Sequence, residues 1–227
     1  MKVIETRNFR SPISDIQNPT ALDSNKYLLL IGEMNPNERQ EGQLVAQFNR
    51  NKTESYSDVL LDSLKRPVNI NVEDINHDGV KDFLVCHYGN LMGKLSWFDG
   101  KNFNENILKP VPGARNTIIK DMNGDDLLDI IALFCQARES ISIFYNQGNG
   151  LFQEEIIQEF PPVYGSSYID VADMNNDGKP DILYTNGDNA DYSIVLKPYH
   201  GLRIFLNNGS NHFNQAYFSQ YTGLQKF

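Results

Sequence analysis

A nine-residue pattern, Asp-x-Asn-x-Asp-x-x-x-Asp, occurs three times in this chain of 227 residues. The copies cover residues 74–82, 121–129 and 173–181, so their starts are 47 and 52 residues apart. Side-chain oxygens at positions 1, 3 and 5 of such a loop can surround one hard cation, and the Asp at position 9 closes the site. Gly79 and Gly178 stand at position 6, where a tight loop favours positive φ. One such loop is compatible with an ordinary turn, but three in the same register indicate a repeat architecture with metal-binding loops.

The residues around each loop repeat as well. A short apolar run follows each last Asp, and its lack of polar alternation is typical of a strand covered on both faces. A second run ends in an aromatic residue and a turn, a third begins near a Phe, and the approach to the next loop provides a fourth. Four antiparallel strands per unit predict an all-β chain of β-propeller blades. The alternative, a β-sandwich, gives no reason for a metal loop to recur in every unit. The runs after the loops are 83–86, 130–134 and 182–184, and those that end in turns are 97–100, 144–148 and 205–209.

We expect residues 1–227 to form a single β-propeller domain or a propeller fragment, with about four four-stranded antiparallel blades. Gly113 and Gly165 each lie eight residues before a loop, and Gly223 has the same place in a further unit. The favoured interpretation is a larger propeller whose remaining blades lie beyond Phe227. Alternatively, the last strand completes the first blade and closes a ring of about four or five. The expected blades are roughly 10–64, 65–112, 113–164 and 165–222, with a further blade starting at 223–227.

From about residue 65 to residue 227, the loops resemble those of the FG-GAP/VCBS-repeat propellers, the superfamily that includes the integrin α-subunit propeller. The Phe-Gly…Gly-Ala-Pro strings of that family are absent, so the chain is most similar to the bacterial VCBS branch. The resemblance implies that each loop joins the innermost strand of a blade to the second strand and binds Ca²⁺, giving about three structural ions. It also implies a ligand set of the side chains at positions 1, 3, 5 and 9 and the backbone carbonyl at position 7. These residues are Asp74, Asn76, Asp78, Val80 and Asp82; Asp121, Asn123, Asp125, Leu127 and Asp129; and Asp173, Asn175, Asp177, Lys179 and Asp181.

Two segments depart from the pattern. Asp126 stands at position 6 of the second loop, and because Asp tolerates left-handed φ better than most residues, we expect the loop to form. A weaker copy extends from Asp15 to Asp23, with Gln17 and Pro19 in place of two ligands. We interpret it as a simple turn or as the remnant of a blade that binds no metal, and the turn is favoured.

Composition narrows the function classes. The formal net charge of −9 argues against a nucleic-acid partner, which requires a basic face. We expect the excess of Asp residues to be required for binding the ions, because three Ca²⁺ would bring the net charge from −9 to about −3. No apolar run is long enough for a membrane span, and residues 1–7 lack the apolar region of a secretion signal, which says little if the chain is a fragment. We expect Cys86 and Cys135 to be free thiols, with a disulfide between them as the alternative.

A ligand is expected on the face opposite the calcium loops, where the resemblance implies that partners commonly bind. The segments 186–200 and 31–43 form long loops there, and long loops in compact domains are often functional. Aromatic rings mixed with Asp and His side chains suit a glycan or a protein segment. The alternative is that the Tyr and His side chains pack the loop against its neighbours and that Arg138 pairs with Glu139. The candidate ligand-binding residues are His87, Tyr88, Arg138, Asp188, Asp191, Tyr192, Tyr199 and His200.

The sequence therefore predicts a calcium-stabilised module that is extracellular, attached to the cell surface or periplasmic, and that binds a protein or a glycan. No catalytic constellation is predicted, because no nucleophile elbow or Cys–His arrangement is evident. One alternative is a polysaccharide-active enzyme of the lyase or dehydratase type, with His200 as base and Asp188 or Asp191 as its orienting residue. Another is a purely architectural set of blades, completed by further blades or subunits.

Overall fold

The computed structural model describes residues 12–17, 26–33, 35–49, 55–136, 138–187, 197–209 and 212–221. Its regular structure is β, apart from one 3-10 turn, η1 (Pro162–Tyr164). The chain divides into two compact units, and each is described by itself. Unit 1 comprises residues 1–74 and 79–112, and unit 2 comprises residues 75–78 and 113–227. No helix within the described ranges is long and apolar enough to cross a membrane.

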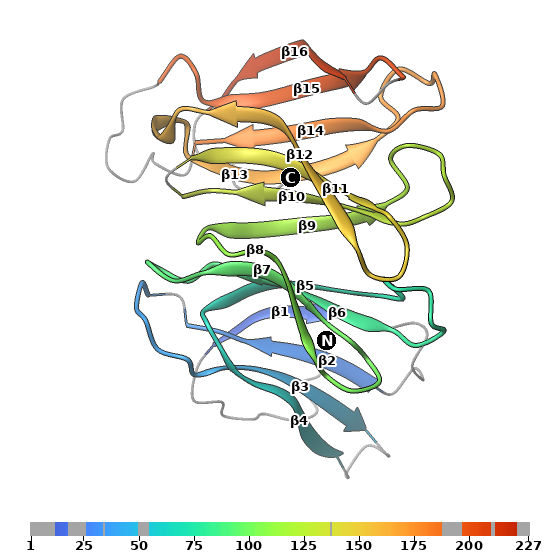
Figure 1. Cartoon of the computed structure of the whole chain (residues 1–227). Helices are drawn as coiled ribbons and strands as arrows, with labels where there is room; N and C mark the ends of the chain where they lie inside the picture. Colours follow the sequence, from blue (N-terminus) through green and yellow to red (C-terminus); the bar gives the residue numbers. More distant parts are fainter. Residues whose placement is uncertain are drawn as a thin grey trace. The chain divides into compact units, whose positions relative to one another are not determined.

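Unit 1 contains two four-stranded antiparallel sheets whose strands pair in chain order (Figure 1). The first sheet contains β1 (Ile13–Gln17), β2 (Lys26–Ile31), β3 (Gly42–Asn49) and β4 (Ser55–Leu64). The second sheet contains β5 (Pro67–Glu73), β6 (Asp82–His87), β7 (Lys94–Phe98) and β8 (Glu105–Lys109).

Unit 2 repeats this arrangement (Figure 1). One sheet contains β9 (Ala114–Lys120), β10 (Asp129–Phe134), β11 (Glu139–Asn146) and β12 (Phe152–Phe160). The other contains β13 (Ser166–Ala172), β14 (Asp181–Asn186), β15 (Gly201–Asn207) and β16 (Phe213–Gln220). Each acidic loop joins the first strand of a sheet to the second, as predicted.

The predicted fold class is confirmed. The described chain is all-β, with four sheets of four antiparallel strands, consistent with propeller blades. The apolar runs after the loops form the second strands, and every residue of β6 and β10 is buried. Burial on both faces explains why these strands show no alternation of polar and apolar residues. Both cysteines are free thiols, and Cys86 is buried.

The two sheets within each unit are joined through their first strands. In unit 1, the Asp15 carboxylate on β1 accepts hydrogen bonds from the Asn69 side chain and the Ile70 backbone N–H of β5, both at 3.0 Å. In unit 2, the Asn116 side chain on β9 donates to the Ile169 carbonyl of β13 at 3.1 Å and accepts its N–H at 3.4 Å. A polar side chain on one first strand thus caps the backbone of the next, which fixes neighbouring sheets in register.

The structure corrects the interpretation of residues 15–23 as a weaker loop copy. Asp15 lies inside β1, opposite Leu30 of β2, and does not follow the strand as the first Asp of each true loop does. Its carboxylate is occupied by hydrogen bonds to β5. Asp23, the other end of that copy, lies outside the described residues.

Candidate functional site

The three acidic loops share one backbone conformation. Position 6 has positive φ in every loop, at 84° for Gly79, 66° for Asp126 and 84° for Gly178. The prediction that Asp126 accepts this conformation is therefore confirmed. Position 4 also has positive φ, which the sequence pattern did not reveal because the residues there differ. They are His77 at 58°, Gly124 at 78° and Asn176 at 60°.

Hydrogen bonds within each loop follow one scheme. The carboxylate at position 1 accepts the backbone N–H of position 6, at 2.9 Å for Asp74, 3.0 Å for Asp121 and 2.8 Å for Asp173. The Asn oxygen at position 3 accepts the N–H of position 5, at 3.1, 3.0 and 3.0 Å in the three loops. The Asn amide donates to the carboxylate at position 5, at 3.3, 2.9 and 3.1 Å. Positions 1, 3 and 5 are thereby held on the same side of a tight loop.

The closing Asp at position 9 is fully buried in all three loops. Asp129 accepts the backbone N–H groups of Met122, at position 2 of its loop, and of Asn146, at the end of β11, both at 2.9 Å. Burial raises the pKa of the Asp129 carboxyl, although these two hydrogen bonds act in the opposite direction. Asp181 makes the same pair of contacts at 2.8 Å, and Asp82 accepts the Gly100 N–H at 2.8 Å. The closing Asp therefore ties each loop to the turn after the third strand, whether or not it also binds a metal.

Two buried Asn residues that the sequence did not single out complete this junction. The Asn146 side chain donates to the Leu128 carbonyl at 3.1 Å, and its oxygen accepts the Gly148 N–H at 2.9 Å. Asn207 makes equivalent bonds to the Pro180 carbonyl at 3.3 Å and the N–H of residue 209 at 2.9 Å. The sequence marks both residues, because each begins an Asn-x-Gly turn shortly after an aromatic residue near the end of a strand.

The donor set of the loops fits a hard cation. Each loop offers only oxygens, from three carboxylates, one Asn amide and backbone carbonyls, which are the ligands that Ca²⁺ prefers. Within the described ranges, no three His, Cys, Asp or Glu side chains converge in the arrangement of a metal site. One ligand position is an Asn, and the closing carboxylate is engaged by backbone N–H groups. Calcium binding therefore stays a prediction.

The charge around the loops differs from one to the next. In the third loop, the Lys179 ammonium lies 3.5 Å from the Asp177 carboxylate at position 5. The pKa of Asp177 is lowered, chiefly by the hydrogen bond from the Lys179 N–H. In the first loop, Lys81 pairs instead with Glu73 on β5, at 2.5 Å. The second loop carries the additional carboxylate of Asp126, so it is the most acidic of the three.

A hollow of about 450 Å³ opens in unit 2 between the second and third acidic loops. Its lining combines a carboxylate and an amide from one loop with a lysine from the other, together with Asn207 at the end of β15. Pockets that hold small ligands have volumes in this range. The hollow lies on the loop side of the sheets, whereas the sequence placed the ligand on the opposite side. The lining residues are Asp121, Met122, Asn123, Gly124, Gly178, Lys179, Pro180, Asn207 and Gly209.

On the side opposite the loops, His87 is only 1% exposed. The Lys65 N–H donates to its Nδ1 at 3.3 Å, so the neutral ring carries its proton on Nε2, 3.1 Å from the Ser96 hydroxyl. That hydroxyl donates to Glu105 at 2.7 Å, and Lys94 donates to the same carboxylate at 2.6 Å. Burial, with help from the Lys94 charge, lowers the pKa of His87 to about 3. Because the Ser96 hydroxyl donates to a carboxylate and not to the imidazole, it is not activated as a nucleophile.

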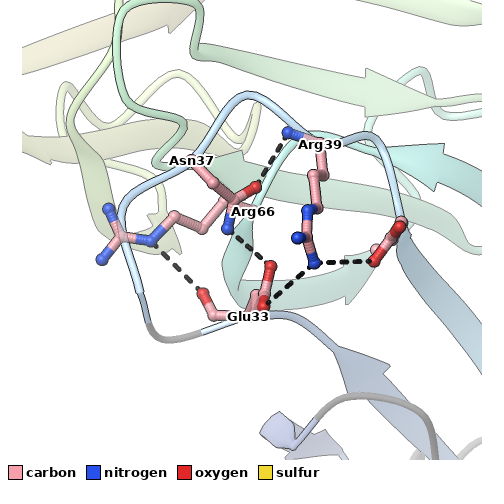
Figure 2. A pocket seen from close by; sticks show the side chains of 6 residues that line it. Glu33, Asn37, Arg39 and Arg66 are labelled. Carbon is pink, nitrogen blue, oxygen red and sulfur yellow. Dashed lines mark hydrogen bonds and ion pairs between the residues drawn. The ribbon is translucent and has the colours of Figure 1, made fainter.

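A small charged hollow in unit 1, shown in Figure 2, is lined by Glu33, Asn37, Arg39, Glu41, Gly42 and Arg66. The Arg66 guanidinium lies 4.9 Å from the centre of the Tyr88 ring and donates to the Glu33 carbonyl at 3.3 Å. Arg39 forms ion pairs with Glu33 at 3.7 Å and with Glu41 at 3.9 Å (Figure 2). The free volume is about 10 Å³, enough for one water molecule. These charges therefore hold the loop in place and leave no room for a larger ligand.

In unit 2, the predicted ligand residues Tyr199 and His200 belong to an aromatic cluster. The Tyr199 ring stacks on Tyr164 at 5.1 Å, and His200, which is 1% exposed, meets Tyr199 edge-on at 5.0 Å. Arg203 lies over the rings of Tyr164 and Phe218, at 5.0 and 4.4 Å, and donates to the Tyr199 carbonyl at 2.8 Å. Burial lowers the pKa of this guanidinium. The contacts favour the alternative in which Tyr and His pack the segment against its neighbours.

The pairing of Arg138 with Glu139, which was part of the packing alternative, is wrong. Arg138 is exposed and lies 4.0 Å from Glu159 on β12. Glu139 is buried and accepts the Ser166 N–H at 2.8 Å and the Ser166 hydroxyl at 2.6 Å. The remaining candidates fall outside the described residues, namely Asp188, Asp191 and Tyr192.

These features define a chain of four-stranded antiparallel sheets with an acidic loop between the first two strands of three of them. Comparison with known families gives the particular type of repeat. Residues 121–184 match the family model described as the FG-GAP-like repeat. The matched segment begins at the second acidic loop and ends on β14, just after the third. The resemblance inferred from the loops is thereby confirmed for this part of the chain.

Proposed function

We propose that this chain is a calcium-stabilised β-propeller module that works outside the cytoplasm, as a secreted, cell-surface or periplasmic protein, and binds a protein segment or a glycan. The observation that supports it best is the repetition of carboxylates at positions 1 and 5 of three loops that share one conformation. The calcium is structural in this proposal.

The hydrogen bonds within the loops do not require these charges. A backbone N–H needs only an acceptor oxygen, which an Asn supplies as well as an Asp, and position 3 uses Asn for that purpose. Two carboxylates held on one side of a tight loop repel each other. A cation held by positions 1, 3 and 5 and the carbonyl at position 7 would neutralise them and stabilise the folded loop.

The hollow between the second and third loops supports a binding role. Lys179, whose side chain is 41% exposed, provides a donor for hydroxyl or carboxyl groups of a ligand. Both walls belong to acidic loops, so ion binding would set the shape of the hollow. His87 and His200 on the opposite side are almost fully buried and offer little surface to a partner.

Calcium alone is the probe for the first test, with thermal unfolding compared in EDTA and in CaCl₂. At ten times the dissociation constant, each site adds about 1.4 kcal/mol. Three sites then raise Tm by roughly 10 °C, at about 2–4 °C per kcal/mol for a chain of this size. Asp125→Asn and Asp177→Asn should each remove about a third of the gain. Asp170→Asn, an exposed Asp on β13, is the matched control and should remove none. An identical Tm in both buffers, with no heat of calcium binding in calorimetry, refutes the calcium assignment.

A printed glycan array and immobilised peptides, probed with and without calcium, test the binding role. Lys179→Ala, which alters the hollow, should weaken binding at least tenfold, whereas Arg138→Ala, exposed at the other end of the strands, should leave it unchanged. The opposite pattern would place the ligand on the face predicted from the sequence.

A further inference from the structure

One lysine engages both oxygens of a predicted metal ligand in the third acidic loop. The Lys179 backbone N–H donates to Oδ1 of Asp177 at 2.9 Å, and the Lys179 ammonium lies 3.5 Å from Oδ2 of the same carboxylate. Asp177 stands at position 5 and Lys179 at position 7, so both belong to the same loop. The chain itself therefore provides a cation beside this carboxylate.

The lysine side chain lies against a glycine of the turn after β15. A Cβ added at Gly209, which has φ of 95°, would lie 2.9 Å from Cε and 3.0 Å from Nζ of Lys179. A larger residue at this place would therefore displace the end of the lysine side chain. Gly148 follows β11 in the same way, and a Cβ added there meets nothing within 4 Å. The contact with the turn thus helps to position the ammonium in the third loop.

The other two loops carry no charged side chain at position 7, where Val80 and Leu127 stand. Lys81, at position 8 of the first loop, pairs with Glu73 on β5, outside the loop. The second loop contains no Lys or Arg among its nine residues and has the additional carboxylate of Asp126. The three loops therefore share a backbone conformation but present different charges to a cation.

We propose that Lys179 is a built-in competitor of the metal, so that the third loop binds Ca²⁺ most weakly of the three and fills last. This inference rests on the proposed calcium binding. A cation that binds Asp177 must displace the ammonium or lie close to a like charge, and either reduces its affinity. The Lys179 and Asp177 side chains are 41% and 33% exposed, so water screens the interaction. We expect the lysine to weaken calcium binding at the third loop by roughly three- to tenfold.

The order of filling couples calcium to the hollow in unit 2. Lys179 lines the hollow together with Asp121 and Asn123 of the second loop. An ammonium displaced from Asp177 is free to donate to an acceptor oxygen of a ligand in the hollow. A ligand that binds the displaced ammonium then favours calcium at the third loop by the same factor, because coupling between two binding sites is reciprocal.

A calcium titration followed by NMR tests the order of filling one loop at a time. The backbone N–H at position 6 donates to the carboxylate at position 1 in each loop, so it reports the occupancy of its own loop. These amides belong to Gly79, Asp126 and Gly178, and the titration midpoint of Gly178 should be the highest. Lys179→Met should lower this midpoint at least ~threefold, whereas Lys179→Arg, which keeps the charge, should leave it within about twofold.

Two further variants control for net charge and test the reverse change. Lys197→Met, in the connection at the other end of β14 and β15, should leave all three midpoints unchanged. Leu127→Lys places a lysine at position 7 of the second loop, where the turn at Gly148 leaves room for its end. It should raise the midpoint of the Asp126 amide at least ~threefold. Both lysine effects should shrink between about 50 and about 500 mM NaCl, because salt screens exposed charges.

The outcomes separate this inference from the calcium assignment. If none of the three amides responds to calcium, both the proposed function and the inference are overturned. If all three respond but Lys179→Met leaves the Gly178 midpoint unchanged, the inference alone is overturned. A change of midpoint that persists undiminished in high salt would assign the effect to the contact with Gly209 and not to charge, and would also overturn the inference.

Discussion

Replacing Asp129 with Asn separates the structural role of a closing Asp from any role in metal binding. Its two carboxylate oxygens accept the N–H groups of Met122 and Asn146, and the side chain is 0% exposed. Asn is almost the same size, but one of its terminal atoms is a donor. One of the two backbone N–H groups must then face an NH₂ group and stay without an acceptor in a buried place. A buried unsatisfied donor costs about 1–3 kcal/mol, so we expect Asp129→Asn to lose that much stability in EDTA, with no metal present.

The assay is urea unfolding at pH 7 in excess EDTA, combined with amide hydrogen exchange of Met122 and Asn146. One of the two amides should exchange at least tenfold faster in Asp129→Asn. The control is Asp125→Asn at the exposed position 5, where an Asn oxygen can still accept the Leu127 N–H. It should change stability in EDTA by less than about 0.5 kcal/mol, as surface substitutions do. If Asp129→Asn is as stable as the parent chain in EDTA, and both amides keep their protection, the assigned hydrogen bonds are wrong.

Two further predictions concern a buried imidazole and a strained loop residue. Folded His87 has a pKa of about 3 against 6.5 when unfolded, so only the unfolded chain takes up this proton as the pH falls below 6.5. Stability should fall by about 2 kcal/mol between pH 7 and pH 5, and His87→Gln should flatten this dependence in urea titrations; an unchanged slope contradicts the assignment. Asp126→Gly should stabilise the chain in EDTA by about 0.5–1 kcal/mol, because glycine adopts the left-handed conformation without strain. Gly178→Ala should lower the stability by about the same amount, because the added Cβ meets nothing within 4 Å and only the positive φ opposes it. A destabilised Asp126→Gly would show that the Asp side chain itself supports the loop.

The fold was predictable because its signals are local and repeated. The acidic loops fixed the register, and the apolar runs after them revealed strands buried on both faces, as β6 and β10 are. The site was predictable only in part. Positions 1, 3 and 5 lie together as expected. The sequence could not show that both carboxylate oxygens of Asp129 accept hydrogen bonds from backbone N–H groups. That role depends on Asn146, 17 residues away, and on burial, which the loop sequence alone does not report.

On the opposite face, the described contacts favour packing over ligand binding, for a related reason. A His or Tyr in a long polar segment is equally compatible with binding and with packing, and only tertiary contacts decide between them. His87 is neutral and buried in a chain of hydrogen bonds, and Tyr199 stacks on Tyr164. Of the residues in the 186–200 segment that suggested a ligand, Tyr199 packs in an aromatic cluster beside Arg203.

The position eight residues before each loop shows that the repeat is defined by backbone conformation more than by residue type. The glycines noticed there, Gly113 and Gly165, have φ of 93° and 63°, and their carbonyls each accept an N–H at 2.8 Å from just beyond the second strand. Arg66 stands in the same place before the first loop, has φ of 45° and accepts the equivalent N–H at 3.1 Å. The left-handed conformation destabilises an arginine by about 1 kcal/mol. The Arg66 guanidinium offsets this loss by donating hydrogen bonds to the carbonyls of Glu33 and Gly89. A search of the sequence for glycine at this position therefore misses the blade that begins near Arg66, although its backbone has the same left-handed conformation and the same hydrogen bond. The Arg66 side chain binds carbonyls of neighbouring loops instead.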